Sequence, residues 1–331
     1  MFRKVSLFIM TIALLLGACT PATTSTPAPT AAPQIEPTAT PRVEPTATFA
    51  PVPEPIQLTD GLGRKVQLAQ PAQRIISIAP SNTEILFALG ASSQVIGREE
   101  LSDYPEAAKK VTSIGSVFGK INTEAIVALK PDLVLAAEIN APEQAKALED
   151  LGLTVYYLSN PKDFDGLYAN LNTVGLLTGH GAEAQQLIES IEARYQAVTE
   201  KVAGSSLKPK VFYEVDATDP TKPYTTGPGT FIDKLIDLAG GYNIGRALKD
   251  QFAAISSEEL VKQNPDIIVL GDSLYGVTAD AVAQRAGWNK LTAVQKKAIY
   301  TFDDNLVSRP GPRLIDGLEQ LAKLIHPELF K

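Results

Sequence analysis

The sequence contains few of the residues that build most catalytic and metal centres. Its 331 residues include one cysteine, Cys19, and two histidines, His180 and His326. One cysteine cannot form a disulfide within the chain, and two isolated histidines provide neither a zinc site nor a catalytic triad. The Gly-x-Ser-x-Gly, Walker and Gly-x-Gly-x-x-Gly motifs are also missing from the sequence. We therefore expect a protein that is not an enzyme and that has no cofactor and no metal site of its own.

Basic residues and long apolar runs are scarce as well. The chain has 30 lysines and arginines against 37 aspartates and glutamates, a formal net charge of −7. Because the basic residues do not cluster, we expect no nucleic-acid partner. The apolar run at residues 7–16 is short for a membrane span and typical of a secretion signal.

The N-terminus has the order of a lipoprotein signal. Arg3 and Lys4 precede the apolar run, which ends in Leu-Gly-Ala-Cys19, similar to a bacterial lipobox. We predict a lipoprotein signal peptide over residues 1–19, lipid attachment at Cys19, and an exported chain anchored to the cell membrane and facing the periplasm or the exterior. An ordinary signal peptide with an incidental cysteine is the alternative. Residues 20–55 are rich in proline and threonine, cannot bury a core, and predict an extended tether.

One stretch of the remaining sequence occurs twice. Glu124 begins a short amphipathic segment, and seven residues later Pro131-Asp132 precedes an apolar run. Glu258 and Pro265-Asp266 repeat this order. Proline ends a helix, and a short apolar run without polar alternation is typical of a buried parallel strand. The repeat therefore predicts two similar α/β lobes.

Predicted strands and helices alternate on both sides of each repeated stretch. We predict an α/β fold of two lobes, residues 56–160 and 205–331, with mostly parallel sheets flanked by helices. The segment 161–204 is helical and contains one long interlobe helix. Ser81 or Asn82 is expected to cap the helix that follows the first parallel strand.

The loops that follow the predicted strands are the candidate ligand site, because open α/β sheets bind ligands beyond the carboxyl ends of their strands. These and neighbouring loops combine aromatic faces with a few hydrogen-bonding groups, which suits a large, flat, partly polar ligand. A receptor for a bare metal ion would bring more histidines. Taken singly, each residue is also explained by capping or packing, so the prediction rests on the set. The set is Ser81, Asn82, Tyr104, Val117, Phe118, Asp216, Tyr224, Tyr275, Asn305 and Arg309.

The two glutamates of the repeat have two explanations. Acidic residues in the first turn of a helix complement the helix macrodipole, and Ser256 with Glu259 has the spacing of a capping box. On this reading Glu124 and Glu258 are structural. Their equivalent placement in both halves is also what a matched functional pair would show.

Several longer motifs resemble a known family. Residues 74–90, the sequence Ser-Asp-Tyr-Pro at 102–105, Thr-Gly-Pro-Gly-Thr at 226–230 and Arg-Pro-Gly-Pro-Arg at 309–313 resemble the helical-backbone substrate-binding proteins of ABC importers. That family takes up vitamin B12, ferric siderophores and haem. The resemblance covers residues 56–330 and is strongest to the vitamin B12 branch, although Val117-Phe118 stand where a B12 receptor has tryptophan.

The resemblance implies a function and partners. A corrinoid would bind in the cleft between the lobes, closure would be small because a helix is a stiff hinge, and Glu124 and Glu258 would dock onto arginines of an ABC permease dimer with its ATPase. The chain would act as a lipid-anchored monomer. A ferric-siderophore or haem receptor is the alternative ligand class, and a surface-anchored sensor or adhesin without a permease is the alternative of another class.

Overall fold

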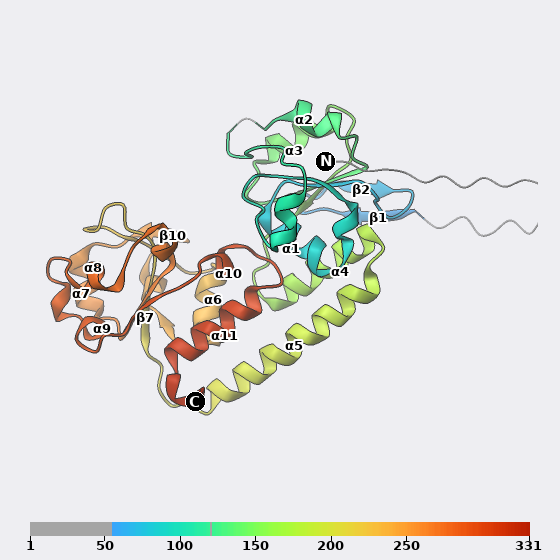
Figure 1. Ribbon diagram of the computed structural model, residues 1–331. Coiled ribbons are helices and arrows are strands. Elements are labelled where there is room, and N and C mark those ends of the chain that lie inside the picture. The colour runs from blue at the N-terminus through green and yellow to red at the C-terminus, as the bar shows by residue number, and fades with distance from the viewer. Residues whose placement is uncertain (1–54, 120) are drawn as a thin grey trace, which may run out of the picture. The chain divides into compact units, whose positions relative to one another are not determined.

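The computed structural model describes residues 55–119 and 121–331 (Figure 1). The predicted signal peptide, Cys19 and the predicted tether up to residue 54 lie outside these residues. Within the described part, no helix has the length and apolar character needed to cross a membrane. The same residues contain no group of three or more histidine, cysteine, aspartate or glutamate side chains placed to hold a metal ion.

The N-terminal lobe has a parallel sheet in the order β4-β3-β5-β6 and an antiparallel hairpin, β1-β2. Helix α1 begins at Pro80 with Ala79 as its N-cap, so neither Ser81 nor Asn82 caps it as expected, since proline at the first position already suits a helix start. The elements are β1 (Ile56–Thr59), β2 (Lys65–Leu68), β3 (Ile75–Ser77), α1 (Pro80–Ala88), β4 (Val95–Arg98), α2 (Thr123–Ala128), β5 (Leu133–Ala137), α3 (Pro142–Glu149) and β6 (Val155–Leu158).

Two helices follow, α4 (Phe164–Thr178) and α5 (Gly181–Ala203). Gly179 ends α4 in the left-handed conformation, with φ of 79°, which glycine adopts at no steric cost. Helix α5 runs from the N-terminal lobe along α11 of the C-terminal lobe (Figure 1). It is the long helix that the sequence predicts between the lobes.

The C-terminal lobe has a mixed sheet in the order β10-β8-β7-β11-β12, with β9 beside β7. Strands β7, β9, β11 and β12 are parallel, and β8 runs antiparallel to both of its neighbours, β7 and β10. The elements are β7 (Lys210–Asp216), β8 (Tyr224–Thr226), α6 (Phe231–Leu238), β9 (Tyr242–Asn243), β10 (Phe252–Ala254), α7 (Ser257–Gln263), β11 (Ile267–Leu270), α8 (Ala279–Ala283), α9 (Thr292–Gln295), β12 (Ile299–Thr301), α10 (Asn305–Ser308) and α11 (Leu314–Ile325).

Strands β5 and β11, at the centre of the two sheets, are buried on both faces, which is why they are continuously apolar. In β5, Leu133 and Leu135 face one cluster while Val134 faces another, and β11 alternates in the same way. The inner cluster is continuous across both lobes and includes Leu171 of α4 and Ile191 of α5. Each outer cluster belongs to one lobe and is covered by the helix of the repeat, α2 or α7. The lobes are thus joined by packed side chains as well as by the chain.

The repeated Pro-Asp stretch makes the same contacts in both lobes. The Asp132 carboxylate accepts hydrogen bonds from the backbone N–H groups of Gln73 and Arg74, at 2.8 and 2.9 Å. Asp266 accepts one from the N–H of Lys210, at 2.9 Å. In return, the Arg74 and Lys210 side chains donate to carbonyls at the ends of α2 and α7. Each aspartate therefore fixes the entry of the neighbouring strand, β3 or β7.

We predict that Asp132→Ala lowers the free energy of unfolding by about 1 kcal/mol, because two exposed backbone N–H groups exchange a charged acceptor for water. Asp266→Ala should cost less, since it removes one such bond. Urea unfolding with an unchanged m-value measures both changes. Asp150, whose 2.7 Å bond to Lys146 is exposed, is the matched control and should cost less than about 0.5 kcal/mol. Equal losses in all three variants would contradict this role.

Candidate ligand-binding site

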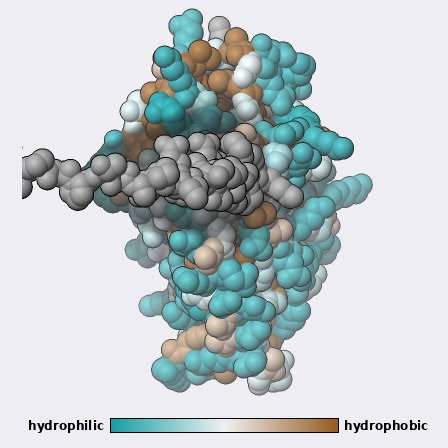
Figure 2. Space-filling model, turned by 90° about the vertical axis from the view of Figure 1, so that its right-hand side faces the viewer, coloured by the Kyte–Doolittle hydropathy of each residue, from teal (hydrophilic) through white to brown (hydrophobic). Residues whose placement is uncertain are grey.

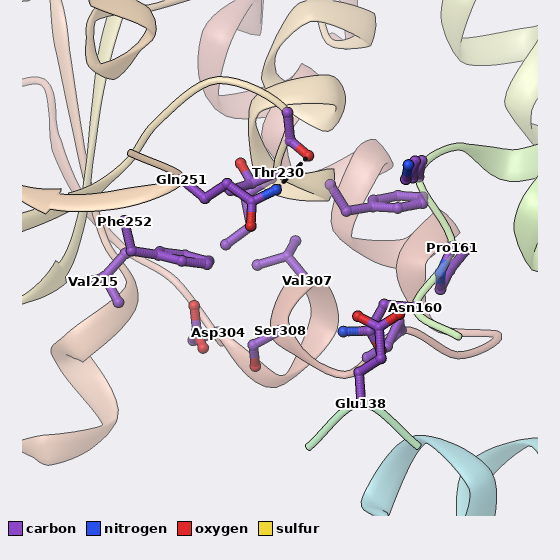
Figure 3. Close-up of a pocket in the computed structure, with 15 residues that line it drawn as sticks. Glu138, Asn160, Pro161, Val215, Thr230, Gln251, Phe252, Asp304, Val307 and Ser308 are labelled. Carbon is purple, nitrogen blue, oxygen red and sulfur yellow. Dashed lines mark hydrogen bonds between the residues drawn. The ribbon is translucent and has the colours of Figure 1, made fainter. Parts of the chain in front are cut away.

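A cavity of about 390 Å³ lies between the lobes (Figure 3). Its walls come from the segments that follow β5, β6 and β12, from the end of β7, and from the start of α6 and β10. This is the carboxyl edge of both parallel sheets, where ligands of α/β folds bind. The lining residues are Glu138, Asn160, Pro161, Lys162, Val215, Gly229, Thr230, Phe231, Ile232, Gln251, Phe252, Asp304, Val307, Ser308 and Pro310.

The cavity lining combines aromatic and polar side chains. Phe252 and Gln251 of the C-terminal lobe lie on one side in Figure 3, and Glu138 and Asn160 of the N-terminal lobe lie opposite. The Phe252 side chain is 52% exposed, so its ring is available to a ligand. Phe231 is held from behind by Phe164 of α4, with ring centroids 5.7 Å apart. The site therefore offers phenyl faces together with amide, hydroxyl and carboxylate groups.

A smaller cavity of about 260 Å³ continues this site. It shares Glu138, Asn160, Ser308 and Pro310 with the larger cavity. It adds Pro80 and Ser81 from the first turn of α1, and Arg309. Ser81 and Arg309 both belong to the predicted ligand set. The cleft therefore extends from β10 in one lobe to α1 in the other.

Asp304 is the acidic group on the C-terminal side of the cavity. The buried Tyr213 hydroxyl donates a 2.7 Å hydrogen bond to its Oδ1 atom. Burial raises the pKa of the Asp304 carboxyl, while hydrogen bonds from Tyr213 and Ser308 work in the opposite direction. Burial, together with the nearby Asp304 carboxylate, also raises the pKa of Tyr213 well above its usual value. Tyr213 therefore remains the donor of this bond.

An ion cluster joins the lobes beside the cavity. Glu84 of α1 is 3% exposed, and Arg313 binds it with two hydrogen bonds of 2.6 and 2.8 Å. Arg309 reaches Asp103 at 2.7 Å and Glu84 at 3.4 Å. The Arg313 guanidinium also lies 3.9 Å from the centre of the Tyr104 ring. These contacts fix the separation of the lobes at this edge of the cleft.

A second buried ion cluster lies outside the cavity lining. Arg285 donates a hydrogen bond to each carboxylate oxygen of Glu214 on β7, and the bond to Oε1 measures 2.8 Å. Asp272, after β11, is 2% exposed, and neither of its carboxylate oxygens has a hydrogen-bond partner among the described residues. Burial and the neighbouring Glu214 carboxylate raise the pKa of Asp272 to about 7. Asp272 thus holds a proton up to near-neutral pH, which limits the negative charge buried beside Glu214.

Only some of the predicted ligand-binding residues lie in the cleft. Ser81 and Arg309 line the cleft. Val117 is 3% exposed and fills the outer cluster of the N-terminal lobe, because an apolar side chain in this loop packs inward. Tyr104 lines a different cavity, together with Arg313. Neither cleft cavity is lined by the remaining members, which are Asn82, Phe118, Asp216, Tyr224, Tyr275 and Asn305.

The sequence prediction also missed lining residues. Asn160 and Lys162 follow β6 directly, so the strand-end rule that selected the other loops applies to them as well. Gln251 and Phe252 had no such signal. They belong to the antiparallel edge formed by β8 and β10, and this edge was not expected from the sequence.

Glu124 and Glu258 are both exposed, in the first turns of α2 and α7. Both helices precede a parallel strand and cover an outer cluster. Figure 2 shows a largely hydrophilic face with apolar residues gathered at the end where α2 lies in Figure 1. In α2 itself, Val127 is 42% exposed.

Comparison with known proteins decides the family. The sequence pattern of the periplasmic binding protein family matches residues 75–306. The chain belongs to this family. This binding protein is 37% identical to the uncharacterized ABC transporter substrate-binding lipoprotein YvrC of Bacillus subtilis over 284 residues, which are 84% of the chain and 87% of YvrC. The predicted family and two-lobed α/β fold class are confirmed.

Two solved structures show the same fold. The periplasmic vitamin B12 binding protein BtuF of Vibrio cholerae matches with a TM-score of 0.68 and 28% identity, over 79% of this chain and 99% of BtuF. The periplasmic heme-binding protein RhuT from Roseiflexus sp. RS-1 matches with a TM-score of 0.70 and 25% identity, over 78% of this chain and 99% of RhuT. This binding protein therefore shares its two-lobed fold with receptors for different ligands.

We predict that Arg313→Ala lowers the free energy of unfolding by about 3–5 kcal/mol, because it leaves the buried Glu84 carboxylate without its main partner. Arg194 is the matched control. It binds Asp316 and Glu319 at 2.6 and 2.8 Å in a half-exposed position, so Arg194→Ala should cost about 1 kcal/mol or less. Urea unfolding of both variants tests this, and equal losses would show that the Glu84 contacts do not hold the lobes.

Proposed function

We propose that this binding protein captures a corrinoid in the cleft between its lobes and delivers it to an ABC permease. The observation that carries the proposal is the chemistry of the larger cavity. Its described lining has two phenyl rings, two amides, two hydroxyls, two carboxylates and one ammonium group, but no histidine, cysteine, methionine or tyrosine side chain. A corrinoid holds its cobalt within its own ring system, so its receptor needs no metal ligand. Its ring and peripheral amides match Phe252, Asn160 and Gln251.

The size of a corrinoid determines how far the lobes must open to bind it. A corrinoid is larger than a 390 Å³ cavity, so part of it must project from the cleft or the lobes must separate to admit it. The contacts of Glu84 with Arg309 and Arg313 cross this boundary. The continuous inner cluster opposes large movements. We therefore expect binding to involve a small opening with most of the fold unchanged.

Haem or a ferric siderophore is the second candidate. The observation that favours it is Tyr275, which is 88% exposed after β11, at the carboxyl edge of the sheet but outside the lining of both cleft cavities. A phenolate is an established ligand of haem iron. Lys162 adds positive charge to the cleft, which anionic groups of either ligand would use. The fold match to RhuT is compatible with this reading.

Titration of the purified chain with cyanocobalamin, haem and a ferric hydroxamate distinguishes these ligands. We expect cyanocobalamin to bind at least tenfold more tightly than the other two, which corresponds to about 1.4 kcal/mol. Phe252→Ala should weaken this binding by about tenfold through loss of ring stacking, whereas Tyr275→Phe should leave it within twofold. Tight haem binding that Tyr275→Phe abolishes would replace the corrinoid with haem.

The proposed complex has defined partners. The chain acts as a monomer anchored through Cys19, and Glu124 and Glu258 dock onto basic residues of the permease, whose ATPase drives import. Both glutamates are exposed on equivalent helices, one on each lobe. Exposed carboxylates at two matched positions suit a permease dimer that presents the same basic surface twice. An exposed apolar side chain of α2, Val127, adds contact area.

We predict that Glu124→Gln combined with Glu258→Gln lowers ligand uptake by cells at least tenfold, because both docking charges are lost. Ligand binding to the purified variant should change less than twofold. Glu143→Gln with Asp280→Asn is the matched control, since both are exposed acids in the first turns of α3 and α8. Normal uptake by the Glu124 and Glu258 variant would instead support a sensor or adhesin without a permease.

A further inference from the structure

We propose that Asp304, positioned by Tyr213, makes the cleft select corrinoids whose peripheral side chains end in amides over those whose side chains end in carboxylates. This selectivity rests on the corrinoid-binding function proposed above. Asp304 lines the cavity, and Tyr213 is buried beneath it.

The pair is built into the packing of the C-terminal lobe. Tyr213 lies on β7, is fully buried, and packs edge-to-face on Phe302, with ring centroids 6.0 Å apart. Its hydroxyl donates to Oδ1 of Asp304 at 2.7 Å. A Cβ atom on Gly271 would lie 2.7 Å from the Tyr213 ring and 3.0 Å from the same Oδ1 atom. The absence of a side chain at Gly271 is what allows Tyr213 and Asp304 to meet.

Asp304 points toward the space that a ligand would occupy. In Figure 3 its carboxylate lies near Ser308 and on the same side of the cavity as the Phe252 ring. A carboxylate accepts about four hydrogen bonds, so the bond from Tyr213 leaves capacity for a donor on the ligand. A ligand ring stacked on Phe252 would bring its peripheral side chains within reach of Asp304. An amide N–H group there would be bound.

The charges around the cavity disfavour an anionic group at this position. Glu138 faces the cavity from the opposite lobe, and Lys162 is the cation in the described lining of the larger cavity. Arg309 is occupied by Asp103 and Glu84. A ligand carboxylate near Asp304 would meet a like charge in a partly desolvated site, which costs affinity. An amide of the same size would gain a hydrogen bond instead.

The selectivity depends on the ionised form of Asp304. Burial and the neighbouring Asp303 raise the pKa of Asp304, and Tyr213, Ser308 and Arg309 lower it. Removing the Tyr213 hydroxyl takes away one influence that favours the ionised form. Selectivity is present above the pKa of Asp304 and is lost as the pH falls through it. Tyr213→Phe should therefore lose selectivity at a higher pH than the unaltered chain.

The test uses a matched pair of ligands, cyanocobalamin and its purified monocarboxylic acid isomers, each with one side-chain amide hydrolysed. At pH 7.5 we expect at least one isomer to bind about tenfold more weakly than cyanocobalamin, an effect of one unfavourable charge contact. Asp304→Asn, which keeps the side-chain volume, should bring that isomer to within about threefold of cyanocobalamin. Asp303→Asn removes a neighbouring charge that does not line the cavity and should keep the tenfold ratio.

Tyr213→Phe tests the positioning role through the pH dependence of the affinity ratio between pH 5 and 8. The ratio should decline at a higher pH than in the unaltered chain. Tyr157→Phe removes the hydroxyl of another buried tyrosine, bonded to the Asn140 carbonyl at 2.9 Å, and should leave the profile unchanged. Coincident profiles for Tyr213→Phe and the unaltered chain would overturn the positioning role.

Different outcomes would contradict the selectivity, the role of Asp304 and corrinoid binding itself. Equal binding of cyanocobalamin and every monocarboxylic acid isomer to the unaltered chain would overturn the selectivity alone. A ratio that Asp304→Asn leaves at tenfold would overturn the assignment to Asp304. Failure of the unaltered chain to bind cyanocobalamin would overturn the corrinoid function and the selectivity with it.

Discussion

Each lobe depends on a carboxylate that closes the turn between a helix and a buried strand. Asp132 and Asp266 bind the backbone at the entry of the neighbouring strand, and the basic residue there binds the end of the helix. These bonds align β5 with β3 and β11 with β7, with Leu133 beside Ile75 and Ile267 beside Val211. The register sets which strand ends meet at the cleft. Both the cavity and the helices that carry Glu124 and Glu258 follow from it.

The repeat was visible in the sequence because both of its parts are local. Proline followed by aspartate marks the turn, and an apolar run marks a strand buried on both faces. The long helix was equally visible, since its apolar residues recur at helical spacing and Gly179 marks its boundary with α4. Two lobes and an interlobe helix could therefore be predicted without coordinates.

The cleft was only partly predictable, for a physical reason. Ser81 and Arg309 could be found because they follow strands or lie in recognisable motifs. Gln251 and Phe252 reach the cavity through the pairing of β10 with β8, which is a contact between distant segments that no local pattern records. Val117, in contrast, was predicted to contact the ligand but lies in the core. An apolar residue in a loop can face a ligand or the core, and only the packing around it decides between them.

The inner cluster, which runs through both lobes, also constrains how the sequence can change. Residues such as Leu171 and Ile191 belong to a core that includes Ile75 of one sheet and Val211 of the other. A substitution there must suit two sheets at once, whereas one in an outer cluster must suit a single lobe. Sequence drift between relatives should therefore be slowest along the facing sides of α4 and α5. The loops of the cleft, which carry no such double requirement, are free to diverge toward different ligands.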